Sequence, residues 1–355
     1  MAYPLNTLKT QQVIGVSASV NITYISSMKL LFLPFFLLGY FTVFSQTVQK
    51  KPVRIILDTD IGPDYDDVGA MAVLHALADK GEAIPLAVMA SNKNDLVAPT
   101  IDILNTYFGR PDLPIGAPKG EGANIGAWQK WPEMLIEKYP HKVKSTADVQ
   151  DAVALYRKIL AQQPDNSVTI ASIGFLTNLS NLLNSGSDKY SDLPGRDLVK
   201  RKVSKLVSMA GWFPKGREYN LLTDSVASAN VFNNWPTPVI FSGFEIGNEI
   251  KTGLRFVHDA ALHGPVKDVF AFCIPKAKED SAGRMSWDET TVLVAILGAK
   301  PYFGLERGHI LIKGGNDSWK KDKNGSGYYL TKAMPYHQLA AILESYMEHE
   351  GKQNK

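Results

Sequence analysis

The chain has 355 residues, enough for two small domains or for one large α/β domain with a substantial core. Apolar residues make up 45% and charged residues 21%, a composition that excludes a disordered chain, a collagen-like repeat and a multi-span membrane protein. The formal net charge is +3, so no strong basic field is present to attract nucleic acid, and the single cysteine, Cys273, cannot form an intramolecular disulfide.

The first feature along the chain is an apolar run, residues 30–44, which follows Met28 and Lys29. The run is shorter than the roughly 20 residues that a bilayer-spanning helix needs. A positive start, a short apolar stretch and a small residue at Ser45 predict a signal peptide that is cleaved near Ser45. A membrane anchor or a buried helix is the alternative interpretation.

The signal peptide predicts an exported protein, periplasmic or secreted, with no membrane contact after cleavage. We expect residues 1–45 to comprise this signal with an upstream extension, Met28 being a candidate start. Residues 46–355 then form a single domain, because no repeat or low-complexity linker divides them.

Beyond the leader, apolar β-branched runs alternate with helical periodicity. Strands are predicted at residues 53–57, 84–90, 168–172, 206–209, 239–241 and 310–312. Helices are predicted at residues 67–78, 95–108, 147–162, 177–183, 225–232, 288–297 and 336–349. This alternation predicts an α/β fold with a mostly parallel central sheet and helices on both faces. We expect surface loops at 111–124 and 313–327, and the last helix to pack across the sheet edge.

An acidic segment, Asp58–Asp67, directly follows the first predicted strand and holds five carboxylates within ten residues. In open α/β sheets, ligands bind beyond the carboxyl ends of the strands. Like charges so close repel each other, and burying them is costly unless a cation neutralises them. Oxygen ligands alone favour a hard ion such as Ca²⁺ or Mg²⁺.

Three other interpretations of this segment are a helix-capping turn, an EF-hand and a phosphatase motif. A solvated turn that caps the next helix would account for one aspartate but not for five. An EF-hand is excluded, because Pro63 stands where the loop needs glycine and Gly69 where it needs glutamate. A haloacid-dehalogenase-like phosphatase also opens with strand-Asp-x-Asp, and Ser172 could supply its second motif. Gly62 departs from that pattern, so the phosphatase is the runner-up.

An ordered set of motifs along nearly the whole mature chain resembles the inosine-uridine preferring nucleoside hydrolase family. The matching residues are Asp58, Asp60, Asp66 and Asp67 in an acidic loop lengthened by Asp64-Tyr65, Asn92, Gly109–Gly116, Gly174–Leu179, Glu218-Tyr219-Asn220 with Asp224, and Asp288. The resemblance implies a nucleoside hydrolase-like fold, calcium-dependent hydrolysis of the N-glycosidic bond of ribonucleosides or a related ribosylated compound, and a homodimer or homotetramer.

The resemblance also implies roles for single residues. The Ca²⁺ ligands would be Asp60, Asp67, Asp288 and the backbone carbonyl of Thr177, with Asp60 also the general base. The substrate contacts would be Asp66, Asn92 and Asn220 to the ribose hydroxyls and Glu218 to the 5′-hydroxyl. Asp58 would orient a ligand or the loop backbone. From the residues alone, Thr177 is equally well explained as an ordinary helix cap.

Two tryptophans depart from the family pattern. Trp287 stands where pyrimidine-cleaving members carry the histidine that protonates the leaving base, so purine nucleosides are favoured. Trp287 would contact the base and, with Trp128 or Trp131, could clamp it, although packing roles explain these side chains equally well. Trp212 replaces an asparagine six residues before the glutamate. Loss of the acid also leaves open a nucleoside- or ribose-binding protein with weak or no hydrolysis.

Overall fold

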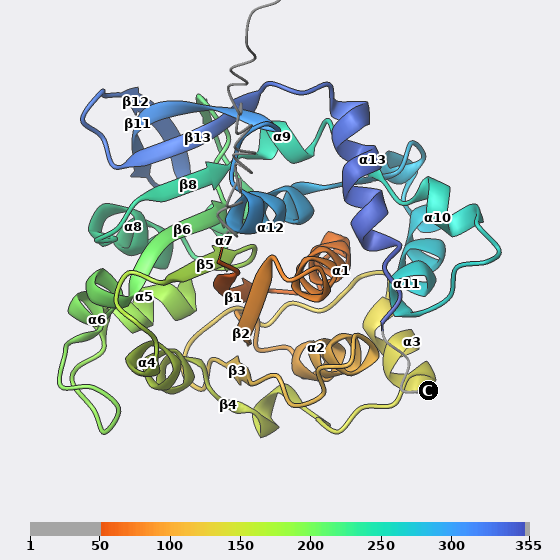
Figure 1. The fold of residues 1–355 in the computed structure, drawn as a ribbon, viewed down its shortest axis with the longest axis horizontal. Coiled ribbons are helices and arrows are strands. Elements are labelled where there is room, and N and C mark those ends of the chain that lie inside the picture. The colour runs from red at the N-terminus through yellow and green to blue at the C-terminus, as the bar shows by residue number, and fades with distance from the viewer. Residues whose placement is uncertain (1–50, 352–355) are drawn as a thin grey trace, which may run out of the picture. The chain divides into compact units, whose positions relative to one another are not determined.

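The computed structural model describes residues 51–351, and the predicted leader lies outside them (Figure 1). The main sheet of the described residues has 11 strands. In spatial order they are β4 (Gln150–Asp151), β3 (Ile115–Ala117), β2 (Ala83–Ala90), β1 (Val53–Thr59), β5 (Val168–Ser172), β6 (Val203–Met209), β8 (Val239–Ser242), β13 (Gly327–Lys332), β11 (Phe303–Lys313), β12 (Asn316–Lys321) and β7 (Lys215–Gly216). A separate two-stranded ribbon pairs β9 (Lys251–Thr252) with β10 (Arg284–Met285).

The strands from β4 to β13 all run parallel to their neighbours, and β11, β12 and β7 continue the sheet in antiparallel pairing. Every residue of the central strand β5 is buried, as expected for a parallel strand that is covered on both faces. The predicted α/β fold with a mostly parallel sheet is confirmed.

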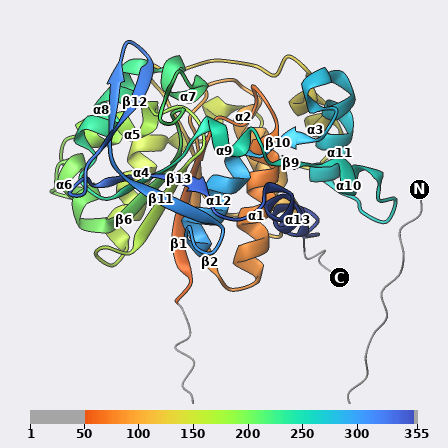
Figure 2. The same ribbon diagram turned by 90° about the horizontal axis from the view of Figure 1, so that it is seen from above.

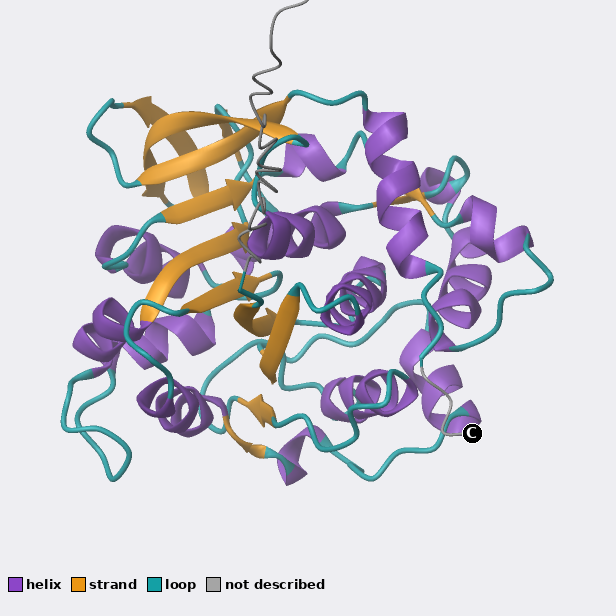
Figure 3. Cartoon of the chain, viewed as in Figure 1, coloured by secondary structure: helices purple, strands orange, loops and turns teal. Residues whose placement is uncertain are grey.

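Helices cover both faces of this sheet (Figure 3). One layer holds α1 (Asp66–Asp79), α2 (Val97–Tyr107), α3 (Trp131–Lys138), α11 (Pro265–Cys273), α12 (Trp287–Leu297) and α13 (Tyr336–Met347). The other holds α4 (Ala152–Gln162), α5 (Thr177–Asn184), α6 (Gly195–Lys202) and α8 (Ser225–Asn234). Each layer packs its own apolar cluster against the sheet, and Figure 2 shows the two layers on opposite sides.

Short helices complete the described part of the chain. They are α7 (Tyr219–Thr223), α9 (Phe244–Gly247) and α10 (Leu254–His258), with 3₁₀ turns at Thr146–Asp148, Ile274–Lys276 and Lys278–Asp280. None of the helices within residues 51–351 combines the length and the apolar composition that crossing a membrane requires.

Two sequence expectations about the C-terminal part are wrong. Residues 313–327, expected to be a loop, contain β12, which is held by pairing with β11 rather than by an apolar run of its own. The last helix, α13, packs on α1 and on β9 rather than across the sheet edge. Its buried residues Leu339, Leu343 and Met347 join the apolar cluster of the α1 layer, which explains that position.

The helices α1 and α12 approach each other closely at Gly69. A Cβ atom on Gly69 would lie 2.2 Å from Oε1 of Glu289 on α12, so a larger residue would displace the Glu289 side chain. Each helix carries two acidic residues in its first turn, Asp66 and Asp67 on α1 and Asp288 and Glu289 on α12. The helix packing therefore brings these two acidic N-termini together.

Candidate active site

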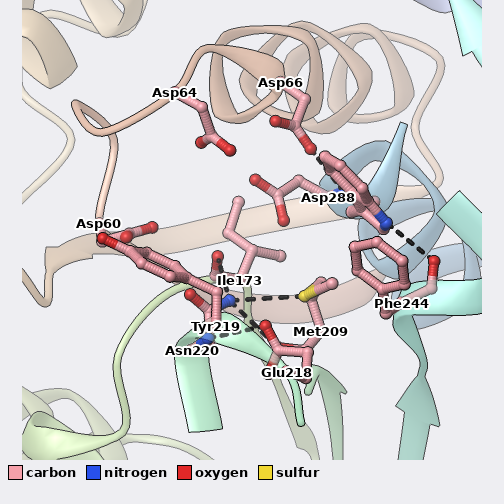
Figure 4. A pocket seen from close by; sticks show the side chains of 11 residues that line it. Asp60, Asp64, Asp66, Ile173, Met209, Glu218, Tyr219, Asn220, Phe244 and Asp288 are labelled. Atoms are coloured by element: carbon pink, nitrogen blue, oxygen red, sulfur yellow. Dashed lines mark hydrogen bonds between the residues drawn. The ribbon is translucent and has the colours of Figure 1, made fainter. Parts of the chain in front are cut away.

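A pocket lies at the carboxyl ends of the neighbouring strands β1, β5, β6 and β8, where an open α/β sheet is expected to bind its ligand. It contains about 490 Å³ of space not filled by atoms, part of which is open to solvent. Five carboxylates line it: Asp60, Asp64, Asp66, Glu218 and Asp288. Its other lining residues are Ile173, Met209, Tyr219, Asn220, Phe244 and Trp287. Figure 4 shows Asp64, Asp66 and Asp288 facing Glu218 and Asn220 across the cavity.

The loop that carries Asp60 is held against the loop after β5. A Cβ atom on Gly174 would lie 2.4 Å from the backbone nitrogen of Asp60, so only glycine permits this approach. Asp58, the last aspartate inside β1, turns away from the pocket and accepts hydrogen bonds from the Tyr156 hydroxyl (2.7 Å) and the Asn178 amide (3.3 Å). Burial raises the pKa of Asp58 to about 7, although both hydrogen bonds act to lower it. Asp58 thus supports the loop from behind.

The expected metal ligands Asp60, Asp67 and Asp288 are all buried. Burial, together with the charge of Asp67, raises the pKa of Asp60 well above its usual range. Burial and the neighbouring aspartates raise the pKa values of Asp67 and Asp288 in the same way. Three carboxylates that desolvate and repel one another form a site that a cation would stabilise.

Whether these residues fit a metal ion can be tested on the side chains themselves. Oδ1 of Asp67 accepts a short hydrogen bond from the Thr59 hydroxyl, whereas Oδ2 is buried and has no hydrogen-bond partner among the described residues. A buried carboxylate oxygen without a donor is an unused ligand for a hard cation. Within residues 51–351, however, no three His, Cys, Asp or Glu side chains form a group that could hold a metal ion. The carboxylate oxygens are therefore suitable ligands for a hard cation, but the described side chains are not arranged as a complete coordination shell.

Two expected site residues, Thr177 and Asn92, do not line the pocket, and the role expected for the backbone carbonyl of Thr177 stays a prediction. Thr177 begins α5, and its hydroxyl donates to Asp224 (2.6 Å). The Asn92 amide donates to the carbonyls of Asp60 (3.2 Å) and Ile125 (2.8 Å), and its oxygen accepts from the Asn94 and Ile125 nitrogens. Asn92 does not line the pocket, so it holds the loop backbone here, and its contact with ribose stays a prediction.

Glu218 and Asn220 lie together on the wall opposite the acidic loop. Glu218 caps α7 and accepts hydrogen bonds from the backbone nitrogens of Asn220 (2.7 Å), Leu221 (3.0 Å) and Gly211 (3.2 Å). Burial raises its pKa to about 7 despite these bonds. The Asn220 amide donates to the carbonyls of Ile173, directly after β5, and of Met209, the last residue of β6, each at 3.3 Å. Both side chains are fixed before any ligand arrives.

The aromatic side chains form a continuous stack on one side of the pocket. Trp287 stacks on Phe244 with ring centroids 5.2 Å apart, and its indole nitrogen donates to the Phe244 carbonyl (2.8 Å). Trp212 also packs against Phe244, with ring centroids 4.4 Å apart and the rings tilted by 38°. In Figure 4, Tyr219 lies across the cavity from Phe244.

The expected partners of Trp287 are wrong. Trp131 is completely buried in the apolar core beneath α3, and Trp128 is 64% exposed and does not line the pocket. Trp131 is therefore a packing residue. The aromatic rings that line the cavity with Trp287 are instead Phe244 and Tyr219, the first residues of the short helices α9 and α7.

Comparison with protein-family models matches residues 55–327 to the inosine-uridine preferring nucleoside hydrolases. The chain belongs to this family. The predicted enzyme class, an N-glycosyl hydrolase, is thereby confirmed at the level of the family, and the phosphatase interpretation is not supported. A search of curated proteins finds no match.

Solved structures of nucleoside hydrolases share the fold. A plant nucleoside hydrolase is 16% identical with a TM-score of 0.64, and the match covers 84% of this chain and 99% of that chain. The inosine-uridine preferring nucleoside hydrolase from Bacillus anthracis is 14% identical with a TM-score of 0.62, covering 83% and 99%. A purine-preferring ribonucleoside hydrolase from Gardnerella vaginalis is 14% identical with a TM-score of 0.62, covering 83% and 96%.

Two charged residues that support segments next to this pocket were not predicted from the sequence. Arg284, in β10, is buried and pairs with Asp64 and Asp66. Asp317, in β12, accepts a hydrogen bond from the backbone nitrogen of Trp212 (3.1 Å). Neither residue belongs to a motif, and Asp64 and Asp66 lie some 220 positions from Arg284 in the sequence, so no local pattern could indicate these pairs.

Proposed function

We propose that the chain hydrolyses the N-glycosidic bond of ribonucleosides in a calcium-dependent reaction, with purine nucleosides preferred over pyrimidine nucleosides. Family membership supports the reaction class. The observation that carries the proposal is one pocket in which Asp60, Asp66 and Asp288 face Glu218 and Asn220. This arrangement surrounds a bound sugar with acceptors for its hydroxyl groups on two opposite walls.

The chemistry of the bond explains why carboxylates line the pocket. Cleavage passes through an oxocarbenium-like sugar, and negative side chains around the ring stabilise its positive charge. Asp60 stands at the end of β1 with its carboxylate in the cavity, so we assign it as the base that takes a proton from the attacking water. Asp66 and Asn220 would hold ribose hydroxyls, and Glu218 the 5′-hydroxyl.

We assign the calcium ligands to Asp60, Asp67, Asp288 and the carbonyl of Thr177. Support comes from the unpartnered Oδ2 of Asp67 and from the mutual repulsion that raises the pKa values of the three carboxylates. A bound Ca²⁺ supplies positive charge that neutralises these side chains and makes nearby water more acidic.

The purine preference rests on the aromatic stack. Trp287 occupies the position of the leaving-group acid and, since an indole donates only weakly and here donates to Phe244, it cannot protonate a base. A large flat base can instead lie against the ring faces of Trp287 and Tyr219. The relative from Gardnerella vaginalis is described as purine-preferring, which agrees with this proposal.

The test is direct. Residues 46–355 are incubated with inosine, guanosine, adenosine, uridine and cytidine in calcium buffer, and the free base is followed by chromatography. We expect base release from purine nucleosides and its loss in Asp60→Asn. Asp112→Asn is the matched control, because the Asp112 side chain is 92% exposed and remote from the pocket. Tight binding without base release would replace the hydrolase with a nucleoside-binding protein.

We further propose that the protein is exported after removal of residues 1–45 and that it forms a homodimer or homotetramer. N-terminal sequencing of protein recovered outside the cytoplasm tests the first proposal, and a start near residue 46 is expected. Light scattering coupled to size exclusion tests the second, and a monomer would refute it.

A further inference from the structure

The two residues that lengthen the acidic loop are both anchored to Arg284. Nη2 of Arg284 donates to Oδ2 of Asp64, and the guanidinium carbon lies 4.9 Å from the centre of the Tyr65 ring. The Tyr65 hydroxyl donates to Asp280 (2.6 Å), which is itself 3.7 Å from Arg284. On its other side the guanidinium lies 5.1 Å from the Trp287 ring. Asp64 is therefore held in one position rather than carried on a loose loop.

Arg284 also donates hydrogen bonds to Asp66, the carboxylate to which the family resemblance assigns a contact with the sugar. Nη2 and Nε of Arg284 donate to Oδ1 of Asp66 at 2.7 and 3.2 Å. Oδ2 of Asp66 accepts from the backbone nitrogen of Asp288 (3.3 Å). Both oxygens of Asp66 are thus already engaged by the protein, and Asp66 is almost completely buried.

Asp64 differs from Asp66 in the oxygen that it leaves free. Only Oδ2 of Asp64 is bonded to Arg284, and Oδ1 has no hydrogen bond to any residue of the described chain. The side chain is 43% exposed and lines the pocket. Figure 4 shows its carboxylate between Asp60 and Asp66, directed into the cavity. Asp64 therefore presents a carboxylate oxygen that no residue of the described chain engages and that a ligand hydroxyl can reach.

We propose that Asp64 binds a secondary hydroxyl of the sugar, and that Arg284 is the positioning residue that aims Asp64 and Asp66 at the substrate. The inference rests on the proposed function, because it concerns the sugar of the same pocket. A hydrogen bond to a charged group contributes about 1.5–3 kcal/mol, so its loss lowers kcat/KM roughly 10- to 150-fold.

The test combines side-chain and hydroxyl removal. Asp64→Ala and wild type are compared on inosine, 2′-deoxyinosine and 3′-deoxyinosine. We expect Asp64→Ala to lower kcat/KM roughly 10- to 150-fold for inosine, and to have almost no effect on the deoxy substrate that lacks the bound hydroxyl. An equal proportional loss on all three substrates would overturn the proposal.

Asp280→Asn is the matched control. Asp280 contacts the same Arg284 and Tyr65 but does not line the pocket, so its replacement leaves the Arg284 hydrogen bonds to Asp64 and Asp66 in place and removes no ligand for the sugar. We expect it to change all three substrates in equal proportion. A substrate dependence like that of Asp64→Ala would overturn the proposal, because the dependence would then not require loss of the Asp64 carboxylate.

Arg284→Lys tests the positioning role, because lysine keeps the charge but cannot donate to two carboxylates as a fork. We expect the same substrate dependence as in Asp64→Ala, and a uniform loss would refute the role of Arg284. If Arg284→Lys does not fold, the two aspartate variants still decide the role of Asp64.

Failure of the proposed function would be seen separately, as absence of base release by wild type on every nucleoside. In that case, calorimetric titration with ribose and with 2-deoxyribose in calcium buffer tests whether Asp64 contacts the sugar. Ribose binding that Asp64→Ala loses and Asp280→Asn keeps supports the contact with Asp64. Equal binding by both variants, or no binding by wild type, overturns it.

Discussion

His75 provides a quantitative test of the packing around α1, the helix that begins with Asp66 and Asp67. The side chain is completely buried, stacks on Phe108 with ring centroids 4.8 Å apart, and lies 3.1 Å from Oδ1 of Asn105 through Nε2. Arg110 can only donate, so its contact with Nδ1 at 3.4 Å fixes the neutral ring with its proton on Nε2. Burial, with the charge of Arg110, lowers the pKa of His75 from 6.5 to about 3.

The direction in which pH changes the folding stability follows from the different protonation of His75 in the folded and unfolded states. The folded state holds His75 neutral while the unfolded state binds a proton below pH 6.5, so stability is present above that pH and is lost as the pH falls. At about 1.4 kcal/mol per pH unit the full effect is about 5 kcal/mol by pH 3, of which about 2 kcal/mol is lost between pH 7 and pH 5.

The assay is urea unfolding at pH 7 and pH 5 of wild type and of His75→Gln, which keeps a polar amide but does not titrate. We expect wild type to lose about 2 kcal/mol more unfolding free energy than the variant over this range. His258→Gln, at an exposed position, is the control and should follow wild type. Parallel pH profiles for wild type and His75→Gln would refute the reasoning.

Three further predictions concern the site and its supports. Removing calcium with a chelator should lower the melting temperature of wild type. The melting temperature of Asp67→Asn should not depend on calcium, and without calcium it should exceed that of wild type, since one of the repelling charges is gone. An unchanged melting temperature of wild type on chelation would contradict the metal assignment. Denaturant unfolding should show that Trp131→Ala costs about 3–5 kcal/mol of unfolding free energy and Trp128→Ala less than about 0.5 kcal/mol. The Trp131 ring is in the core, whereas the Trp128 ring is largely exposed to solvent. Similar losses in the two variants would contradict this difference in packing. Asp317→Ala should lower the unfolding free energy by about 1–3 kcal/mol, because it leaves the Trp212 backbone nitrogen without its acceptor. Asp317→Asn keeps an acceptor oxygen and should retain most of the stability. Equal losses for the two variants in a melting assay would show that the charge, not the acceptor, matters.

The parallel part of the sheet could be predicted from sequence because its strands are buried on both faces and appear as apolar runs. The predicted strand at 168–172 coincides with β5, and the predicted helices at 177–183 and 288–297 differ from α5 and α12 by one residue at one end. The short antiparallel extension escaped prediction because β12 and β7 take their order from pairing, not from their own composition. Strands of this kind carry little local signal.

The site was predictable where its residues stand at strand ends within one motif, as Asp60, Asp66, Glu218 and Asn220 do. Each of these lines the pocket. The sequence could not show that Asn92 is engaged by the backbone or that Trp131 is in the core, because both facts depend on how distant segments pack. Arg284 was missed for the same reason.

The pairing of Arg284 with Asp66 has a consequence for synthesis, since 218 positions separate the two residues. While the chain emerges from the ribosome, the acidic loop is made long before the guanidinium that neutralises part of its charge. A fragment that ends before β10 would expose a cluster of uncompensated aspartates, so completion of the pocket is deferred until most of the polypeptide has been translated.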